Sequence, residues 1–251
     1  MKVFTMPLLP GYIDIVFVLT TLATLLFLYS AIRKTSLHRK AGVILLTLLA
    51  WLAAQAMLTM KNFYNTDTAS FPPRFLLLIG PPVLFIIILF NTKKGKAFID
   101  SLPVLNLTLL HIVRIPVELV LYWLALHKAV PELMTFAGRN FDILSGISAP
   151  FIAYFGLMQK KLSRKVLFLW NVIALLLLFN IVINAVLSAP FAFQLFAFDQ
   201  PNVAVLNFPY SWLPCFIVPA VLFSHLVCLR RVILGTIFPT RRGEASSNHA
   251  N

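Results

Sequence analysis

The chain has 251 residues, of which 60% are hydrophobic and only 12% are charged, and its mean hydropathy is +0.89. These values exclude an ordinary soluble domain and are typical of a protein whose surface lies mostly in lipid. The net charge of +13 does not indicate nucleic-acid binding, because the basic residues lie in short clusters between apolar segments, as topology signals do.

Seven apolar segments follow one another along the chain, each near the ~20 residues that a helix needs to cross a bilayer. The expected membrane helices are residues 12–32, 41–60, 74–90, 102–126, 141–158, 166–187 and 210–234. The first is too long for a signal-peptide core, so we interpret it as a retained helix. The third contains Pro81 and Pro82, which should kink or break it, because proline lacks a backbone N–H group. The connector after the sixth, residues 188–209, is almost uncharged and rich in phenylalanine, which favours a position at the membrane interface.

Lysine and arginine are distributed unequally between the two sides of this arrangement. One side holds fifteen of the 21, near residues 33–40, 93–96, 160–165 and 230–242, and the other side holds five. Because basic residues accumulate in cytoplasmic loops, we expect the N-terminus outside and the C-terminus in the cytoplasm.

The expected fold class is therefore an all-α membrane protein, a seven-transmembrane-helix bundle. Residues 1–240 form a single polytopic membrane domain, and residues 241–251 form a disordered basic and polar tail. The compact chain and the lack of long loops favour the inner membrane of a bacterium.

The fourth expected helix carries the strongest functional signal in the sequence. Because a helix turns by about 100° per residue, four of its polar side chains share a narrow arc of one face. They are His111, Arg114, Glu118 and Tyr122. Ionisable side chains cost roughly 3 kcal/mol each near the bilayer centre, so this face should contact other helices or a wet cavity. Arg114 and Glu118 are four residues apart and can pair along their own helix.

Pro116 lies between these two residues and leaves a backbone carbonyl one turn earlier without its usual N–H donor. This softens the helix, as is found at transport sites and mobile segments, and also at merely structural kinks.

Further polar residues are expected at similar depths in neighbouring helices. They are Gln55, Asp142, Ser145, Asn180 and Asn184, with His225 at about the depth of His111. We expect the first five and Glu118 to meet in one outward-opening pocket floored by Arg114. The alternative is that each polar group bonds a neighbouring helix and contributes about 0.6 kcal/mol to packing.

The entrance of the fifth helix combines a cation, an amide and an acid. Asn140 is expected to cap this helix, with Asp142 favourable in the first turn. The alternative is that Arg139 and Asp142 gate the outer mouth of the pocket.

Catalytic motifs of the HExxH, GxSxG, Walker and GxGxxG types do not occur in the sequence. No metal or cofactor is expected, because His111 has no second histidine or carboxylate one turn away. Cys215 and Cys228 are about 20 Å apart on one helix and cannot pair.

The sequence therefore predicts binding and transport of a small polar or anionic solute, or of protons. Arg114 would hold the negative charge, Glu118 would titrate, and His111 and His225 would pass protons inward. A seven-helix ligand sensor without transport is one alternative, and an intramembrane enzyme acting on a lipid through Glu118 or Asp142 is another. The expected partners are the lipid bilayer and a small-molecule or ion ligand, with no nucleic acid; a homo-oligomer is left open.

Overall fold

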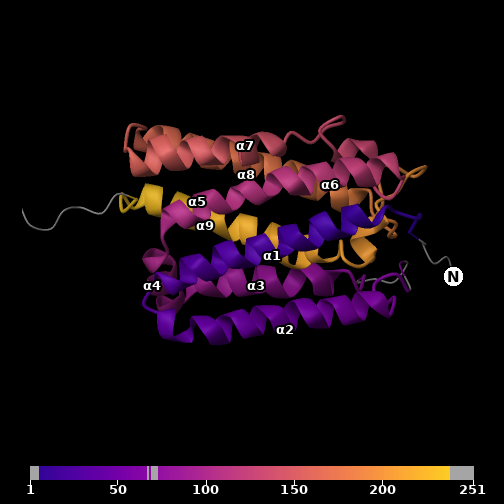
Figure 1. Ribbon diagram of the computed structural model, residues 1–251, viewed down its shortest axis with the longest axis horizontal. Coiled ribbons are helices and arrows are strands. Elements are labelled where there is room, and N and C mark those ends of the chain that lie inside the picture. The colour runs from indigo at the N-terminus through magenta and orange to yellow at the C-terminus, as the bar shows by residue number, and fades with distance from the viewer. Residues whose placement is uncertain (1–5, 67, 69–72, 238–251) are drawn as a thin grey trace, which may run out of the picture.

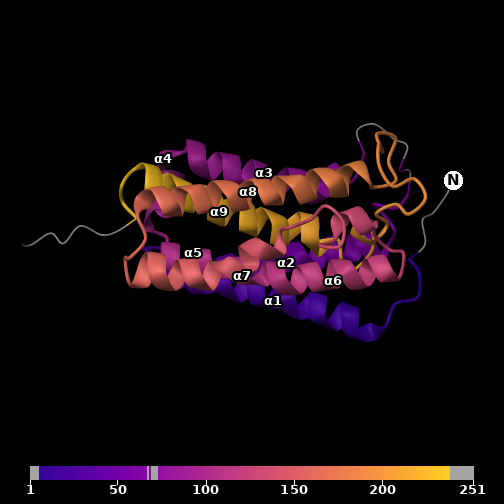
Figure 2. The same cartoon turned by 90° about the horizontal axis from the view of Figure 1, so that it is seen from above.

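The computed structural model describes residues 6–66, 68 and 73–237, and these residues form a bundle of helices without any strand. Five helical segments of the described chain are long and apolar enough to cross a membrane. They are α1 (Gly11–Arg33), η1 with α2 (His38–Lys40 and Ala41–Met60), α5 with η2 and α6 (Val104–Leu110, His111–Val113 and Arg114–Leu126), α8 (Arg164–Leu187), and η6 with α9 (Leu213–Ile217 and Val218–Ile233). They run roughly along the long axis of the molecule, as Figures 1 and 2 show. The length and apolar composition of these helices indicate a membrane-embedded protein.

The other two expected membrane helices differ from the prediction. α3 (Leu76–Asn91) contains Pro81 and Pro82 without ending there, and the chain bends by 94° only where α4 (Lys93–Ser101) begins. α3 and α4 together make one broken span or a re-entrant loop. α7 (Ile143–Phe151) and the π-helical η4 (Ile152–Met158) form a shorter apolar helix. The count of seven crossings and the orientation stay predictions.

The connector of residues 188–209 folds over one end of the bundle, and its position at the membrane interface stays a prediction. Its backbone is tied to the neighbouring loop, because the N–H group of Ala204 donates to the carbonyl of Ala129 over 3.1 Å. Phe191 and Leu206 are buried in the main core. The connector therefore closes this end, which is also the end where α1 begins (Figure 1).

The basic clusters gather at the opposite end of the bundle, around α4 and the C-terminal turn of α9 (Figure 1). There Arg230 donates two hydrogen bonds of 2.9 Å to the carboxylate of Asp100 and ties α9 to α4. The Arg230 guanidinium lowers the pKa of Asp100 below its ordinary value. The expected tail, residues 241–251, lies outside the described residues.

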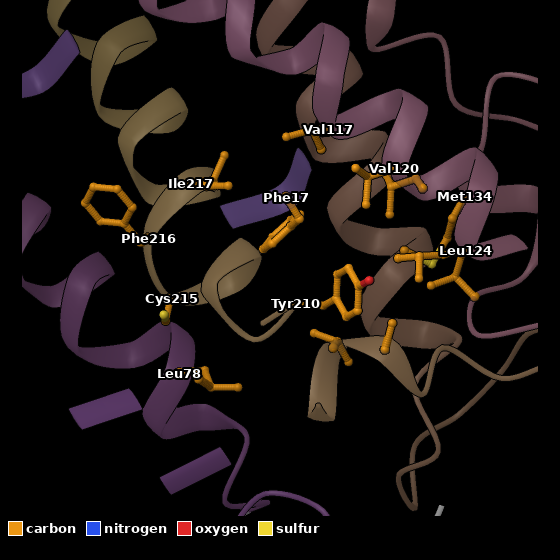
Figure 3. Packing of buried hydrophobic residues seen from close by; sticks show 14 of the residues in the cluster. Phe17, Leu78, Val117, Val120, Leu124, Met134, Tyr210, Cys215, Phe216 and Ile217 are labelled. Carbon is orange, nitrogen blue, oxygen red and sulfur yellow. The ribbon is translucent and has the colours of Figure 1, made fainter. Parts of the chain in front are cut away.

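Apolar side chains from α1, α6 and η6 pack together in the main core, as Figure 3 shows. The rings of Phe17 and Tyr210 lie 5.1 Å apart between centroids. The Tyr210 hydroxyl donates to Asp14 over 2.5 Å. Burial, and then this hydrogen bond, raise the pKa of Tyr210 above its ordinary value, so the phenol remains a donor.

Candidate functional site

Arg114, the first residue of α6, forms a buried ion pair with Asp142, which lies just before α7. Its Nε donates to Oδ2 of Asp142 over 2.6 Å, and its Nη2 donates to Oδ1. Nη2 also donates to the carbonyl of Ala174 in α8 over 2.9 Å. Arg114 is 2% exposed and Asp142 is 4% exposed, so one guanidinium joins three helices away from solvent. Such a planar two-bond contact fixes geometry as well as charge.

The close approach of α7 to α6 depends on a glycine one turn into α7. A Cβ atom at Gly146 would lie 3.1 Å from the backbone nitrogen of Ile115 and 3.3 Å from Cβ of Arg114. Any larger residue would therefore push α7 away from α6. The glycine sets the distance across which Arg114 and Asp142 pair.

His225 of α9 is the third partner of Arg114, at 3.0 Å between Nη1 and Nε2. Its Nδ1 lies 3.0 Å from Oδ1 of Asn171, whose Nδ2 donates to the carbonyl of Leu167 over 2.9 Å. With the amide held in that direction, Oδ1 can only accept a hydrogen bond. The hydrogen-bond pattern therefore assigns the proton of His225 to Nδ1 and a lone pair to Nε2, which makes the ring neutral.

His111 stacks on His225, with 3.9 Å between ring centroids and 23° between planes. The rings of Trp170 and His111 are T-shaped to each other, with 5.6 Å between their centroids. His111 is completely buried, and neither of its ring nitrogens has a hydrogen-bond partner in the described part of the chain. The two histidines thus meet at one depth, as the sequence predicts, but the contact between their rings is a stack and not a hydrogen bond.

Glu118 does not pair with Arg114, although the two share one helix. Both of its oxygens accept from Nδ2 of Asn140, over 2.6 and 2.7 Å. Oδ1 of Asn140 accepts from the backbone N–H of Asp142 over 3.0 Å. Asn140, which the sequence predicts to cap this helix, therefore joins the Glu118 carboxylate to the backbone N–H of Asp142, and Asp142, directly before α7, makes no side-chain cap. Asp142 takes the guanidinium because its position ahead of α7 lets both of its oxygens face it.

Hydrogen bonds thus run from Glu118 through Asn140, Asp142 and Arg114 to His225. This path does not conduct protons, because a guanidinium is never deprotonated in proteins and an amide does not exchange protons readily. Hydrogen bonds between the described residues therefore give no connected route from Glu118 for the inward relay through His111 and His225 that the sequence suggested, and this relay stays a prediction.

A cavity of about 280 Å³ lies beside this network. Arg114, Glu118 and Asp142 form its charged side. The remaining lining is almost entirely apolar and comes from α3, α6, α8, η6, α9 and the connector. Val117, Val120, Leu124, Met134 and Tyr210 belong to this lining, and Figure 3 shows their side chains turned toward a common space.

The cavity opens sideways and not through the end of the bundle. Where the connector covers it, the lining residues Asn202, Val205 and Tyr210 are all buried. On α3 and α8, by contrast, Val83 and Val182 are half-buried and Phe179 is exposed. The cavity is thus closed at the end where the connector lies, and the lining residues on α3 and α8 are the more exposed ones.

Four of the predicted site residues lie elsewhere. Asn180 donates to the carbonyl of Arg139 over 2.8 Å, and Asn184 donates to the carbonyl of Asn180 over 2.9 Å. Tyr122 stacks on the ring of Phe136 at 4.9 Å. For these residues the local packing alternative describes the contacts, since none lines the cavity.

Gln55 is the fourth, and it faces the loop that follows α2. Its Oε1 accepts from the hydroxyl of Tyr64 over 2.5 Å. Burial raises the pKa of Tyr64 to about 12, which keeps the phenol protonated as the donor. Ser145 is buried near Arg114 on α7, but its hydroxyl has no hydrogen-bond partner among the described residues and does not line the cavity.

Sequence reasoning misses two members of the network. Asn171 is detectable only as an amide in an otherwise apolar span, which is a weak signal. Asn140 looks like a helix cap, and its bridge to Glu118 depends on the tertiary fold. Among the described residues no group of three or more histidine, cysteine, aspartate or glutamate side chains could hold a metal ion, and both cysteines are buried and free.

These features define a helical membrane protein with a buried ion-pair network beside a laterally open apolar cavity. The chain belongs to the family described as Domain of unknown function (DUF8737), which matches residues 71–233. The match includes the network and most of the cavity lining, whereas α1 and α2 precede it. No curated protein and no solved structure matches the chain.

Proposed function

We propose that the protein binds a mainly apolar molecule with one cationic or proton-donating group, and moves it across the membrane in exchange for protons. The observation that carries this proposal is Glu118, a carboxylate on the cavity wall with no cation paired to it among the described residues. Binding would place the ligand's polar group against this carboxylate and its apolar part along the remaining lining.

Charge counting supports a cation or a proton in preference to an anion. Arg114 is the single cation of the network, and Asp142 already neutralises it through two hydrogen bonds. An anion at Arg114 would have to displace Asp142 and leave two carboxylates without a partner. An ionised Glu118 is costly at 1% exposure unless a proton or a cationic group neutralises it. The two neutralised states exclude each other, and this is the basis of an exchange.

The shape of the cavity supports the apolar character of the ligand. A lining with one charged side and otherwise apolar walls is typical of ligand pockets in which a few polar groups fix orientation. The mouth between α3 and α8 would admit such a molecule from the lipid itself. A strongly hydrated solute would lose its water there without replacement partners.

The proposal includes the predicted topology. α3 with α4, and α7 with η4, would complete seven crossings, with the basic end in the cytoplasm of a bacterium and the cavity in the outer half of its inner membrane. α4 would then lie along the inner surface.

Ligand binding in detergent tests the proposal. Tetraphenylphosphonium and tetraphenylborate have similar shapes and opposite charges. We expect the purified protein to bind the cation more tightly than the anion, and to release it as the pH is lowered. Glu118→Gln should abolish this preference, whereas Glu132→Gln, which changes an exposed carboxylate, should leave it unchanged. Stronger binding of the anion would contradict the proposal.

A second candidate is an enzyme that acts on a lipid. The lateral mouth favours it, because a membrane lipid could reach Glu118 without leaving the bilayer. Loss of lipid turnover in Glu118→Gln, with the fold intact and without any transport by the wild type, would establish this candidate.

A further inference from the structure

A second, larger cavity lies on the other side of α3. Its volume is about 640 Å³, and it lies between α2 and α3 above η6 and α9. Its lining is apolar over most of its length and includes Leu48, Trp51, Pro82, Phe85 and Phe223. We call it the α2–α3 groove.

The groove exists because α2 packs against α1 and not against α3. Two indole hydrogen bonds hold α2 to the chain before α9: Trp51 donates to the carbonyl of Cys215 over 3.1 Å, and Trp212 donates to that of Leu52 over 3.0 Å. Both hydrogen bonds join α2 to η6 and the residue before it, and neither of them fills the space between α2 and α3. This gap is therefore part of the fold.

The surroundings of the groove are those of a surface in contact with lipid tails. On α2, Val43 and Leu46 are 66% and 67% exposed, and on α3, Leu84 and Phe85 are 57% and 60% exposed. Such large apolar side chains on the exposed faces of both helices would be covered by acyl chains in a membrane. A chain that enters the groove therefore comes from the bilayer.

The charge at one end of the groove identifies the kind of lipid. Lys94 of α4 lines this end, with Lys93 and Lys96 exposed on the same short helix. Among the described residues, no acidic side chain lines the groove. Because α4 is bent by 94° from α3, these lysines lie at the end of the apolar space, where a headgroup would be. Clustered lysines beside a membrane helix attract anionic headgroups.

We propose that the α2–α3 groove binds an anionic phospholipid, with an acyl chain between α2 and α3 and the phosphate against Lys94. The volume is within the range of about 300–1,000 Å³ of small-molecule pockets, so a chain fits without displacing either helix. The lipid would also pack against the face of α3 that α2 leaves uncovered. This packing would support α3, because Pro81 and Pro82 cannot donate backbone hydrogen bonds within it.

Lipid binding to the detergent-purified full chain tests this proposal. Phosphatidylglycerol and phosphatidylcholine are added separately, and bound lipid is counted by native mass spectrometry while unfolding is followed by heating. We expect one tightly bound phosphatidylglycerol, which raises the unfolding temperature, and a clearly weaker effect of phosphatidylcholine. Equal effects of the two lipids, or the same stabilisation by inorganic phosphate alone, would overturn the proposal.

Two pairs of variants locate the site. Lys94→Gln should weaken phosphatidylglycerol binding about fivefold, whereas Lys93→Gln, next to it but outside the lining, should change it less than about twofold. Thr47→Trp fills the groove and should abolish binding, whereas Leu46→Trp, on the lipid-facing side of α2, should not. Equal effects within either pair would place the lipid elsewhere and contradict the assignment. Unfolding of each variant without lipid is measured first, so that a folding defect is recognised.

Discussion

Nη1 of Arg114 and Nε2 of His225 lie 3.0 Å apart and join α6 to α9 across the middle of the bundle. The same guanidinium pairs with Asp142 on the other side, so the carboxylate of Asp142 neutralises its charge within the protein. This arrangement leaves Glu118 as the carboxylate of the network that has no cation paired to it among the described residues.

Removal of one partner of the Arg114–Asp142 pair is expected to destabilise the fold, whereas removal of both partners should destabilise it much less. Asp142→Asn should destabilise the protein by about 3–5 kcal/mol, because it leaves a buried cation without its counter-ion. The double variant Arg114→Met with Asp142→Leu should recover most of that loss, since a matched apolar pair needs no desolvation. Reversible unfolding in detergent mixtures measures all three proteins. Additive losses in the double variant would show that the two charges do not act as a pair.

Gly146 should be intolerant of a side chain. Gly146→Ala is expected to cost about 1–3 kcal/mol, because the new methyl group meets the backbone of Ile115 at 3.1 Å and separates α7 from α6. Gly42→Ala is the control, since a Cβ there meets nothing within 4 Å and alanine favours the helix by up to ~1 kcal/mol. Unfolding of the two variants under one condition makes the comparison. If both glycines tolerate alanine equally, α7 does not approach α6 as described.

The stability of the basic end should depend on acid pH through Asp100. Its folded pKa is lowered, mainly by the hydrogen bonds from Arg230, so the carboxylate stabilises the fold above its ordinary pKa near 3.8. That contribution, less than about 1 kcal/mol for a partly exposed pair, is lost as the pH falls through the lowered folded value.

The corresponding experiment compares unfolding of the wild type and Asp100→Asn between pH 7 and pH 3. The difference should be constant above the ordinary pKa and should shrink below it. Asp199→Asn, which removes an exposed carboxylate, should show no such difference. A difference that grows on acidification would have the wrong sign for this ion pair.

Filling the lateral cavity should block ligand binding without unfolding the protein. Ala185 lines the cavity on α8, and Ala185→Phe would place a ring in the space between α8 and α3. Leu176→Phe, on a position of the same helix that is 62% exposed and outside the lining, is the matched control. Tetraphenylphosphonium binding should fall at least tenfold in the first variant and stay within about twofold in the second. Unchanged binding in Ala185→Phe would place the ligand outside this cavity.

The sequence predicts the membrane helices well, because apolar segments of about 20 residues have few alternatives. It is less informative about α3 and α7, where bends and short lengths depend on neighbouring helices. It places His225 at the depth of His111, where the two rings stack, and it expects the charged groups to find partners within the bundle. It cannot choose Asp142 over Glu118 as the partner of Arg114, because that choice depends on the position of α7 around α6.

The closure of one end of the cavity by the connector could not be predicted either. The connector of residues 188–209 has the composition of an interfacial segment, and Phe191 is buried in the main core while Phe198 stays exposed. Composition gives the affinity of such a segment for apolar surroundings, but both the membrane interface and the protein core satisfy it. The hydrogen bond between Ala204 and Ala129, which fastens the connector to the neighbouring loop, depends on the tertiary fold and has no signal in the composition.

The central claim, that Glu118 exchanges a proton for a cationic ligand, is tested most directly by flux into proteoliposomes. Vesicles with an acidic lumen and a neutral exterior are given labelled tetraphenylphosphonium at zero membrane potential, with wild type, Glu118→Gln or Glu132→Gln. We predict uptake against its gradient by the wild type and Glu132→Gln, accompanied by loss of luminal protons, and no uptake by Glu118→Gln. Equal uptake by Glu118→Gln and the wild type, or uptake without proton movement, would contradict the account.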